Sequence, residues 1–297
     1  MNESQSKKQY WLWVTGPEYY LDEDGQDLQS LDPAYESDTS GWWTCDRRTR
    51  QGDLVFLYRT SPKMDIAYLM QATSDAFDIN DDYYTSEKGW DYGCEFRVMQ
   101  KLQNPITIQD LRKDKLMRDW PVLKAQFRRR SWAIASEYWE RLNELAQKSN
   151  RGYETAVEKV QKSINRDIAY ESELEEALFQ DLTPLKKFGY DLEIYNDRHS
   201  GKKGKQFICS GKGGRIDLLC YDRKKRKYVV IELKNVSASQ KTIGQIMKYM
   251  GWVSQNISKG SPVLGLVISR GTEPEFELGL LGGAPIESLD LKQLGFR

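Results

Sequence analysis

Short runs of aromatic and β-branched residues predict strands in the first half of the chain. These runs lie at residues 10–14, 54–58, 65–74 and 92–102. Turn residues separate them, with Gly52-Asp53 before the second run and Asn104-Pro105 after the last. Thr107 is the expected cap of a short helical segment, and a second helix is predicted from Ser136, as N-cap, to Leu145. Short strands followed by helices predict a small β-barrel with peripheral helices.

The second half changes to a mixture of helical and strand periodicity. ESELEEALFQDL (171–182) places Leu174, Leu178 and Leu182 at helical spacing. A strand at 190–195 follows, then a hairpin whose turn is Asp222–Lys227, a helix at 242–253 and an apolar strand at 263–269. This α-β-β-β-α-β order predicts a mixed sheet flanked by helices.

A chain of 297 residues has room for two domains, each large enough to bury a core. The polar segment 146–170 is expected to be a helical linker between a domain at 9–145 and a domain at 171–297. The predicted fold class is therefore a two-domain α+β or α/β protein.

The composition excludes several classes of protein. Hydrophobic residues make up 39% and charged residues 30% of the chain, as in ordinary globular proteins. No apolar stretch of ~18 residues predicts a membrane span, and the N-terminus carries no signal peptide pattern. Four scattered cysteines without a CxxC motif favour free thiols in the cytoplasm. His199 is the single histidine, which argues against Ser-His-Asp and Cys-His catalysis.

Charge is balanced overall but not locally. The formal net charge is zero, yet eleven Lys and Arg residues lie between Arg198 and Lys227, opposed only by Asp217 and Asp222. Arg215 belongs to this run. Basic residues beside acidic ones suit a phosphodiester substrate, although such a run is also found on ordinary solvated faces.

Two carboxylates and a lysine in apolar strands form the strongest chemical signal. Asp217 lies in GRIDLL, and IELK follows fifteen positions later with Glu232 and Lys234. Residues two apart on a strand share a face, and the hairpin brings Asp217 beside them. Oxygen ligands hold Mg²⁺, which can activate water against a phosphodiester, while a lysine can stabilise the transition state. On the following helix, Gln245 and Tyr249 share one face and can bond a phosphate, a water or the lysine.

These residues resemble the NucS-type endonuclease domain of the PD-(D/E)XK superfamily. The segments GRIDLL, VVIELK and GQIMKYMGWV occur in order over roughly residues 171–270. The resemblance implies a catalytic set of Asp217, Glu232, Lys234, Gln245 and Tyr249. It also implies an acidic first-helix residue that completes a metal site with Asp217 and Glu232. We choose Glu175, with Glu171, Glu173 and Glu176 as alternatives. The segment 200–214 is longer than expected, which puts substrate preference in doubt.

Residues 9–145 resemble the EVE domain, a PUA-like fold related to YTH domains. The matching segments are YWLWV, GWWTCDRRTRQGDLVFLYRTS, AYLMQATSDA and WDYGCEFRVMQKLQNPITIQDL, with SEYWERL at the helical end. The resemblance implies a pocket for a flipped, modified base, which requires aromatic faces and polar groups. Aromatic candidates are Trp42, Trp43, Tyr58 and Trp90, and polar candidates are Thr44, Ser61 and Asp91. Arginines 47, 48, 50, 59 and 128–130 are candidates for phosphate contacts.

Trp42 and Trp43 are adjacent, so we expect one to face the core and the other to face outward. The resemblance places pocket residues just before the Thr44-Cys45 turn, which favours Trp42 for the pocket. Each aromatic residue can equally be a core residue of a small barrel.

The combination predicts a modification-dependent restriction endonuclease. It would read modified cytosine in double-stranded DNA by base flipping and cut nearby with Mg²⁺ or Mn²⁺. A duplex break requires two active sites, which favours a homodimer. The alternatives are a mismatch- or structure-specific endonuclease, a non-catalytic reader of modified nucleic acid, and an RNA-directed protein.

Overall fold

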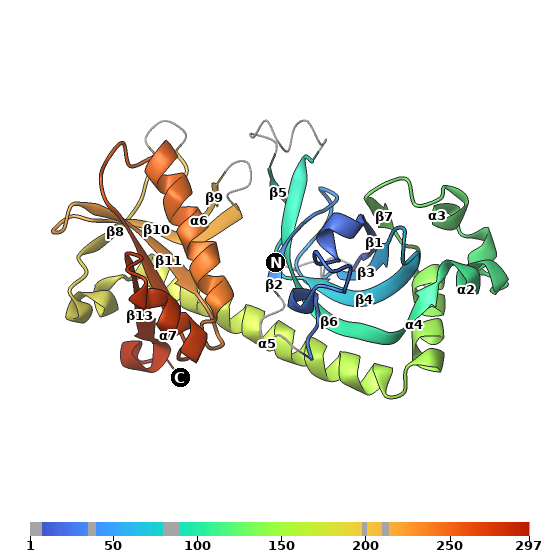
Figure 1. The fold of residues 1–297 in the computed structure, drawn as a ribbon. Coiled ribbons are helices and arrows are strands. Elements are labelled where there is room, and N and C mark those ends of the chain that lie inside the picture. Colours follow the sequence, from blue (N-terminus) through green and yellow to red (C-terminus); the bar gives the residue numbers. More distant parts are fainter. Residues whose placement is uncertain (1–7, 35–39, 80–89, 198–200, 210–213, 297) are drawn as a thin grey trace, which may run out of the picture. The chain divides into compact units, whose positions relative to one another are not determined.

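The computed structural model describes residues 8–34, 40–79, 90–197, 201–209 and 214–296. The chain divides into two compact units, one made of Met1–Phe77 with Trp90–Asn165 and the other of Asp78–Gly89 with Arg166–Arg297. Each unit has its own sheet, so the protein is a mixed α and β structure (Figure 1). None of the helices in these described parts is both long and apolar enough to cross a membrane.

A curled seven-stranded sheet forms the first unit, in the order β2-β6-β4-β3-β1-β7 with β5 paired to β6 (Figure 1). The strands are β1 (Tyr10–Thr15), β2 (Ser40–Thr44), β3 (Leu54–Arg59), β4 (Asp65–Ala72), β5 (Phe77–Asp78), β6 (Tyr92–Thr107) and β7 (Ser131–Ala133). Every residue of β4 is buried, which explains its place in the middle of the sheet. β1 pairs with β3 in parallel, whereas the other pairings along this order are antiparallel.

Aromatic side chains dominate the packing on both faces of this sheet. On one face, Trp11 and Trp13 of β1 are completely buried in a cluster with Val55 and Leu57 of β3. On the other, the indole of Trp139 stacks on Tyr10 and packs against Phe56 at a centroid distance of 4.7 Å. The helices of this unit are α2 (Ile108–Lys113), α3 (Pro121–Lys124), α4 (Ser136–Ser149) and the first part of α5 (Tyr153–Gln180), with 3₁₀ turns at Pro17–Tyr19, Gln29–Leu31 and Met117–Asp119.

The second unit is built on a six-stranded mixed sheet, in the order β13-β12-β11-β10-β8 with β9 paired to β10. Its strands are β8 (Leu192–Ile194), β9 (Lys205–Cys209), β10 (Gly214–Asp222), β11 (Lys227–Leu233), β12 (Val263–Ser269) and β13 (Ile286–Asp290). β10 and β11 form the predicted antiparallel hairpin, and β11, β12 and β13 run parallel. The apolar residues of β11 and β12 are buried because helices and 3₁₀ turns cover both faces of the sheet.

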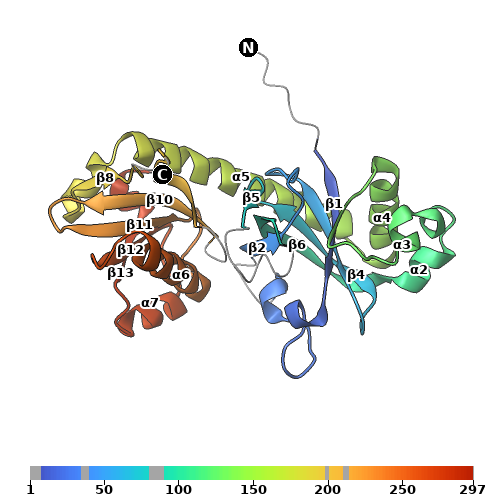
Figure 2. The same cartoon turned by 90° about the horizontal axis from the view of Figure 1, so that it is seen from above.

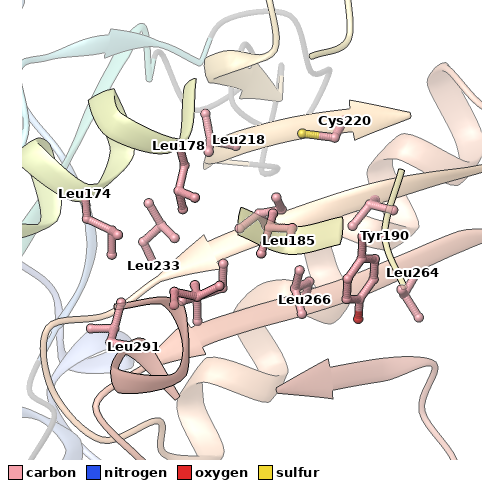
Figure 3. Close-up of a cluster of buried hydrophobic side chains, with 14 residues drawn as sticks. Leu174, Leu178, Leu185, Tyr190, Leu218, Cys220, Leu233, Leu264, Leu266 and Leu291 are labelled. Carbon is pink, nitrogen blue, oxygen red and sulfur yellow. The ribbon is translucent and has the colours of Figure 1, made fainter. Parts of the chain in front are cut away.

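Two hydrophobic clusters lie on the two faces of this sheet. Figure 2 shows α5 along one side of the strands β10 and β11. One cluster contains Leu174 and Leu178 of α5, which pack toward Leu218 and Leu233 of the hairpin (Figure 3). The 3₁₀ turns Thr183–Phe188 and Leu291–Leu294 contribute to the same cluster. The other cluster is covered by α6 (Gln240–Asn256) and α7 (Pro274–Leu281). Odd-numbered residues of β11 face the first cluster, and Val230 faces the second.

Two helices begin at residues other than the predicted ones. Ser136 is the first residue of α4 rather than its N-cap, which is Ala135. α6 begins at Gln240, because Ser239 caps it in a capping box with Thr242. Thr107 caps α2 as predicted, through a reciprocal bond with Asp110. The segment 146–170 is helical as predicted, but it belongs to two helices, α4 and α5.

Candidate functional site

Asp217 and Glu232 lie at the same end of two neighbouring strands of the second unit. The β10–β11 pairing ends with Leu218 opposite Ile231, and Asp217 and Glu232 are the next residues of the two strands. The backbone amide of Leu233 donates a hydrogen bond of 2.8 Å to Asp217 Oδ2. This bond holds the Asp217 carboxylate beside the end of β11 that carries Glu232.

Lys234 lies on the same face and neutralises Glu232. Its Nζ is 2.8 Å from Glu232 Oε1, as expected for residues two apart on an extended chain. Only 2% of the Glu232 side chain and 14% of the Lys234 side chain are exposed to solvent. Two charges this well buried are stable only as a pair or with a further ion. The three residues Asp217, Glu232 and Lys234 thus form one partly desolvated polar group.

Helix α6 covers the sheet face toward which Glu232 is directed. Gln245 Nε2 donates to the hydroxyl of Tyr249 at 3.1 Å, one helical turn away. Tyr249 is buried and lies close to Gly214. A Cβ atom added at Gly214 would lie 3.1 Å from the Tyr249 ring and 3.3 Å from its hydroxyl oxygen. Gly214, with φ of +85°, begins β10 three residues before Asp217. The helix pair therefore lies over the strand end that carries the carboxylates.

Glu175 does not join Asp217 and Glu232 in a three-carboxylate cluster. Across the described parts of the chain, no group of three His, Cys, Asp or Glu side chains is arranged to hold a metal ion. Glu175 is instead buried on α5, where Gln206 Nε2 donates to its Oε2 and Lys205 Nζ lies 3.8 Å from its Oε1. Burial raises the pKa of this carboxyl, against the opposing effects of Gln206, Lys205 and Arg215.

The other first-helix glutamates lie in different surroundings. Glu171 accepts a hydrogen bond of 2.8 Å from the backbone amide of Asn235. Glu173 is exposed, and Glu176 is an exposed partner of Lys205. Among the four glutamates, Glu175 is the one that is buried, as expected for a residue that shares a helix face with Leu178 and Leu182.

The oxygen donors present fit a hard divalent cation. Mg²⁺ is commonly bound by one or two carboxylates together with waters and substrate phosphates, and Asp217 with Glu232 supplies two. Glu175 Oε1 is buried and has no hydrogen-bond partner, so a further oxygen is available on α5. Asp217 and Glu232 are therefore suitable ligands for Mg²⁺ or Mn²⁺, and the metal site of Asp217, Glu232 and Glu175 expected from the sequence stays a prediction.

The basic run is distributed over both ends of the hairpin. Arg215 is half-buried at the start of β10, and Lys205 belongs to β9 beside it. The exposed residues 223–226 form the β10–β11 turn at the opposite end of the strands. Arg198, His199 and Lys212 lie outside the described residues. Lys205 and Arg215 are thus the described members of the run on the same end of β10 as Asp217.

An aromatic cluster forms the second candidate site, in the first unit. Trp43 lies nearly parallel to Trp13 at a centroid distance of 6.5 Å and meets Tyr19 edge-on at 6.2 Å. Tyr19 in turn contacts Trp90 at 6.1 Å, and the guanidinium of Arg130 lies 5.0 Å over the Trp90 ring. The indole nitrogen of Trp13 is buried and has no hydrogen-bond partner in the described structure. This cluster contains two of the four predicted aromatic candidates.

Trp42 and Tyr58 are not part of this cluster. Trp43 pairs with buried Cys94 and packs into the core face, so Trp42 is directed to the other face of β2. The preference for Trp42 over Trp43 therefore does not agree with the placement of the other aromatic candidates. Tyr58 is buried with its ring stacked on Phe127 at 3.7 Å, and burial raises its pKa to about 12. Tyr58 is a packing residue on the face of β3 opposite to Leu57.

The polar candidates lie at strand ends. Thr44 ends β2 and pairs with Gly93, which follows exposed Asp91 by two residues. Ser61 is exposed after β3. Arg59 is buried, with both of its terminal nitrogens and its Nε bonded to Asp65 and Asp27, so it is committed to the fold rather than to phosphates. Arg47, Arg48 and Arg50 remain exposed near Thr44.

Several residues of both sites carried no recognisable signal in the sequence. Gln206 and Lys205 come to Glu175 through β9, a strand that the hydrophobic pattern did not predict. Tyr19 lies in a 3₁₀ turn, and Arg130 follows Trp90 by about forty positions in the sequence. No local pattern therefore links either residue to the aromatic cluster. Trp13 could have been found from the alternation of YWLWV, which places it on the same face as Trp11.

Comparisons with known proteins give partial matches. A protein from Rhodopseudomonas palustris solved by NMR is 18% identical with a TM-score of 0.36, over 46% of this chain and 92% of that one. A repair endonuclease from Pyrococcus abyssi is 17% identical with a TM-score of 0.33, over 41% of this chain and 46% of that one. A structure described as an EndoMS–dsDNA2 complex is 18% identical with a TM-score of 0.31, over 40% of this chain and 44% of that one.

The chain thus spans less than half the length of these two endonucleases. No curated protein sequence matches the chain. Residues 9–145 match the family model of the EVE domain.

Proposed function

We propose that the protein is a metal-dependent DNA endonuclease that cuts DNA carrying a modified base. The observation that carries the proposal is the group of Asp217, Glu232 and Lys234 at the same end of the adjacent strands β10 and β11, in which Lys234 pairs with Glu232. Buried carboxylates are costly unless they bind a cation or hydrogen-bond donors, and here they accompany a lysine. This is the chemistry that metal-assisted phosphodiester hydrolysis requires.

Asp217 and Glu232 would hold Mg²⁺ or Mn²⁺, and the cation would supply an activated water and neutralise charge on the scissile phosphate. Lys234 would stabilise negative charge that develops on the phosphate, at the expense of its contact with Glu232. The Tyr249 hydroxyl, held by Gln245, would orient the phosphate or Lys234. Arg215 and Lys205 would hold the DNA backbone beside the carboxylates.

The EVE domain would select the DNA. Its resemblance implies a pocket for a flipped base, and the aromatic cluster around Trp43, Tyr19 and Trp90 offers faces for stacking. The buried Trp13 nitrogen is a donor with no hydrogen-bond acceptor in the described structure, which suits a polar edge of a ligand. We infer modified cytosine as the base, a PUA-like barrel and a PD-(D/E)XK sheet as the folds, and a homodimer as the form that breaks both strands.

The decisive experiment compares DNA duplexes of one sequence that carry cytosine, 5-methylcytosine, 5-hydroxymethylcytosine or its glucosylated form. The protein is incubated with each duplex and Mg²⁺, and the products are resolved on a denaturing gel. Cleavage restricted to one or more modified duplexes is the expected result. Equal cleavage of all four would remove the modified base from this proposal. Cleavage of unmodified DNA only where it carries mismatches or branches, tested alongside, would replace the proposal with a structure-specific nuclease.

A catalytic control separates cutting from binding. Lys234→Ala should abolish cleavage of the modified duplex while its affinity in a gel-shift assay without metal remains near that of the wild type. The reason is that Lys234 acts on the transition state, whereas base reading belongs to the other unit. Full cleavage by Lys234→Ala would show that the active site has been assigned to the wrong residues.

A further inference from the structure

The β10–β11 turn carries positive charge at the end of the hairpin that is remote from Asp217 and Glu232. Its four residues, Arg223–Arg226, are all basic and all exposed. They follow Asp222, whose pair with Lys227 closes the β10–β11 ladder at this end. From Asp217 to Asp222 the strand advances roughly 17 Å, at about 3.3 Å per residue. The turn therefore lies too far from the carboxylates to contact the phosphate that would be cut.

A second loop brings another basic residue to the same end of the sheet. Lys259 is exposed in the loop between α6 and β12. β12 pairs in parallel with β11, beginning with Val263 opposite Tyr228, and the amide of Tyr228 donates a hydrogen bond of 2.9 Å to the carbonyl of Pro262. This loop therefore enters the sheet beside the β10–β11 turn. Together, Arg223–Arg226 and Lys259 are called the basic edge.

Only some side chains of the basic edge are held by the fold. Arg223 forms an ion pair with Glu193, and Lys225 Nζ lies 4.5 Å over the ring of Tyr190. The other three side chains have no hydrogen bond, ion pair or ring contact in the described structure, namely those of Lys224, Arg226 and Lys259. These three cations are exposed and unopposed, so they are available to an anionic partner.

The backbone at Arg226 gives a second reason to look for a partner. Its φ is 52° and that of Lys259 is 46°, and these two are the charged residues among the non-glycine residues with positive φ that the structure describes. Glycine adopts such a conformation without steric cost. Lys259 follows the C-terminus of α6, where a cation interacts favourably with the helix dipole. Arg226 has no such use within the fold, so its side chain is better explained by a ligand.

We propose that the basic edge binds the sugar-phosphate backbone of duplex DNA at a distance from the bond that is cut. This inference rests on the proposed function, which brings a duplex to Asp217. Duplex DNA carries a phosphate charge about every 1.7 Å of its axis, so it offers phosphates well beyond the roughly 17 Å that separate the two ends of the hairpin. Contacts of lysine and arginine with phosphates position the DNA without reading its bases. The basic edge would thus add affinity that is independent of sequence and of base modification.

The test combines Lys224→Gln with Arg226→Gly in the full chain. Binding to an unmodified DNA duplex is measured by fluorescence anisotropy without divalent cations, over about 50–200 mM salt. Loss of two phosphate contacts should lower the salt slope, the steepness of log K against log salt concentration, by about 2. It should also weaken binding on the order of tenfold per contact at about 0.1 M salt. The melting temperature should stay at or above that of the wild type, because glycine favours the positive φ of position 226.

The matched control combines Lys113→Gln with Lys115→Gln, which removes the same charge from two exposed lysines at the end of α2. These lysines follow the end of β6 that pairs with Asp65, not the end that pairs with Trp43 and its aromatic cluster. The salt slope of this control should equal that of the wild type. An equal fall in both double variants would mean that net charge alone matters, and would overturn the basic edge as a DNA contact.

Three other results would also overturn it: an unchanged salt slope in the Lys224 and Arg226 variant, a weaker affinity accompanied by a lower melting temperature, or a loss of affinity for single-stranded RNA but not for duplex DNA. The proposed function can fail separately. If the wild type cuts modified DNA while the variant binds duplex DNA as the wild type does, only the basic edge is refuted. If the wild type cuts no DNA but its affinity depends on the basic edge as expected, the edge stands and the nuclease is refuted.

Discussion

Replacing Lys234 by methionine tests how strongly the candidate active site is held together. The substitution keeps an unbranched apolar side chain but removes the ammonium group 2.8 Å from Glu232 Oε1. Glu232 is only 2% exposed, so its carboxylate has little access to water. Removing one partner of a buried ion pair costs about 3–5 kcal/mol, and we expect a loss of this size in the free energy of unfolding of the second unit.

Two further variants make the expectation specific to the pair. Glu232→Met should cost less than Lys234→Met, because Lys234 is 14% exposed and its long side chain can reach water. The double variant should recover much of the loss, since replacing both partners by apolar residues is often neutral. Mg²⁺ at about 100 times its dissociation constant should raise the free energy of unfolding of Lys234→Met by up to about 2.7 kcal/mol, because a bound cation stabilises the folded state.

The assay is hydrogen exchange of β11 peptides during urea titration, which reports on the second unit alone. A loss below about 1 kcal/mol in Lys234→Met would mean that the pair behaves like an exposed surface ion pair. A double variant whose loss equals the sum of the single losses would mean that Glu232 and Lys234 are not energetically coupled. Either result would refute the interpretation of this site as a desolvated polar group.

Three further predictions concern the framework around the sites. Asp53→Asn should lower the free energy of unfolding in urea by about 1–3 kcal/mol. Oδ2 of the buried Asp53 accepts a hydrogen bond of 2.8 Å from Trp11 Nε1, and an asparagine amide can place a second donor there and lose this bond. Gly265→Ala should cost about 1–3 kcal/mol, since its Cβ would meet three buried side chains at 2.8–3.1 Å; an unchanged urea midpoint would contradict this. Hydrogen bonds from Arg141 lower the pKa of Asp114 below 3.8. The ionised carboxylate therefore stabilises the folded state fully above about pH 4, and this stabilisation is lost as the pH falls through the lowered pKa. Arg141→Ala should therefore reduce stability at neutral pH and flatten its decline in acid, measured by thermal melting from pH 2 to 7.

The sequence was sufficient where function and local periodicity coincide. The proximity of Glu232 and Lys234 could be predicted because residues two apart on a strand share a face, and one hairpin turn brings Asp217 to the same end of β10 and β11. A continuous apolar run likewise predicted the buried strand at 263–269, which the structure pairs in parallel with β11. These features depend on contacts between segments close in sequence, which a pattern of hydrophobic residues can specify.

Contacts at the edge of the sheet could not be predicted in this way. β9 is polar at Lys205 and Gln206 and contains a left-handed residue, so neither alternation nor composition distinguishes it from a loop. Its pairing with β10 determines what lies next to Glu175. Helical periodicity therefore indicates Glu175 as a buried glutamate of α5, whereas its neighbours Gln206 and Lys205 could not be predicted. Its role as a metal ligand stays a prediction.

The adjacent tryptophans show why a pattern can specify an alternation without specifying its direction. Two successive strand residues must face opposite sides, so one of Trp42 and Trp43 had to enter the core. Which one does so depends on the pairing of β2 with β6, where Trp43 is opposite Cys94 and Trp42 is opposite Glu95. Cys94 is completely buried, and its side of the ladder carries the stacked Trp13 and Trp43 rings. A one-residue shift of this register would exchange the two tryptophans, so the partner strand determines which aromatic face is available to a base.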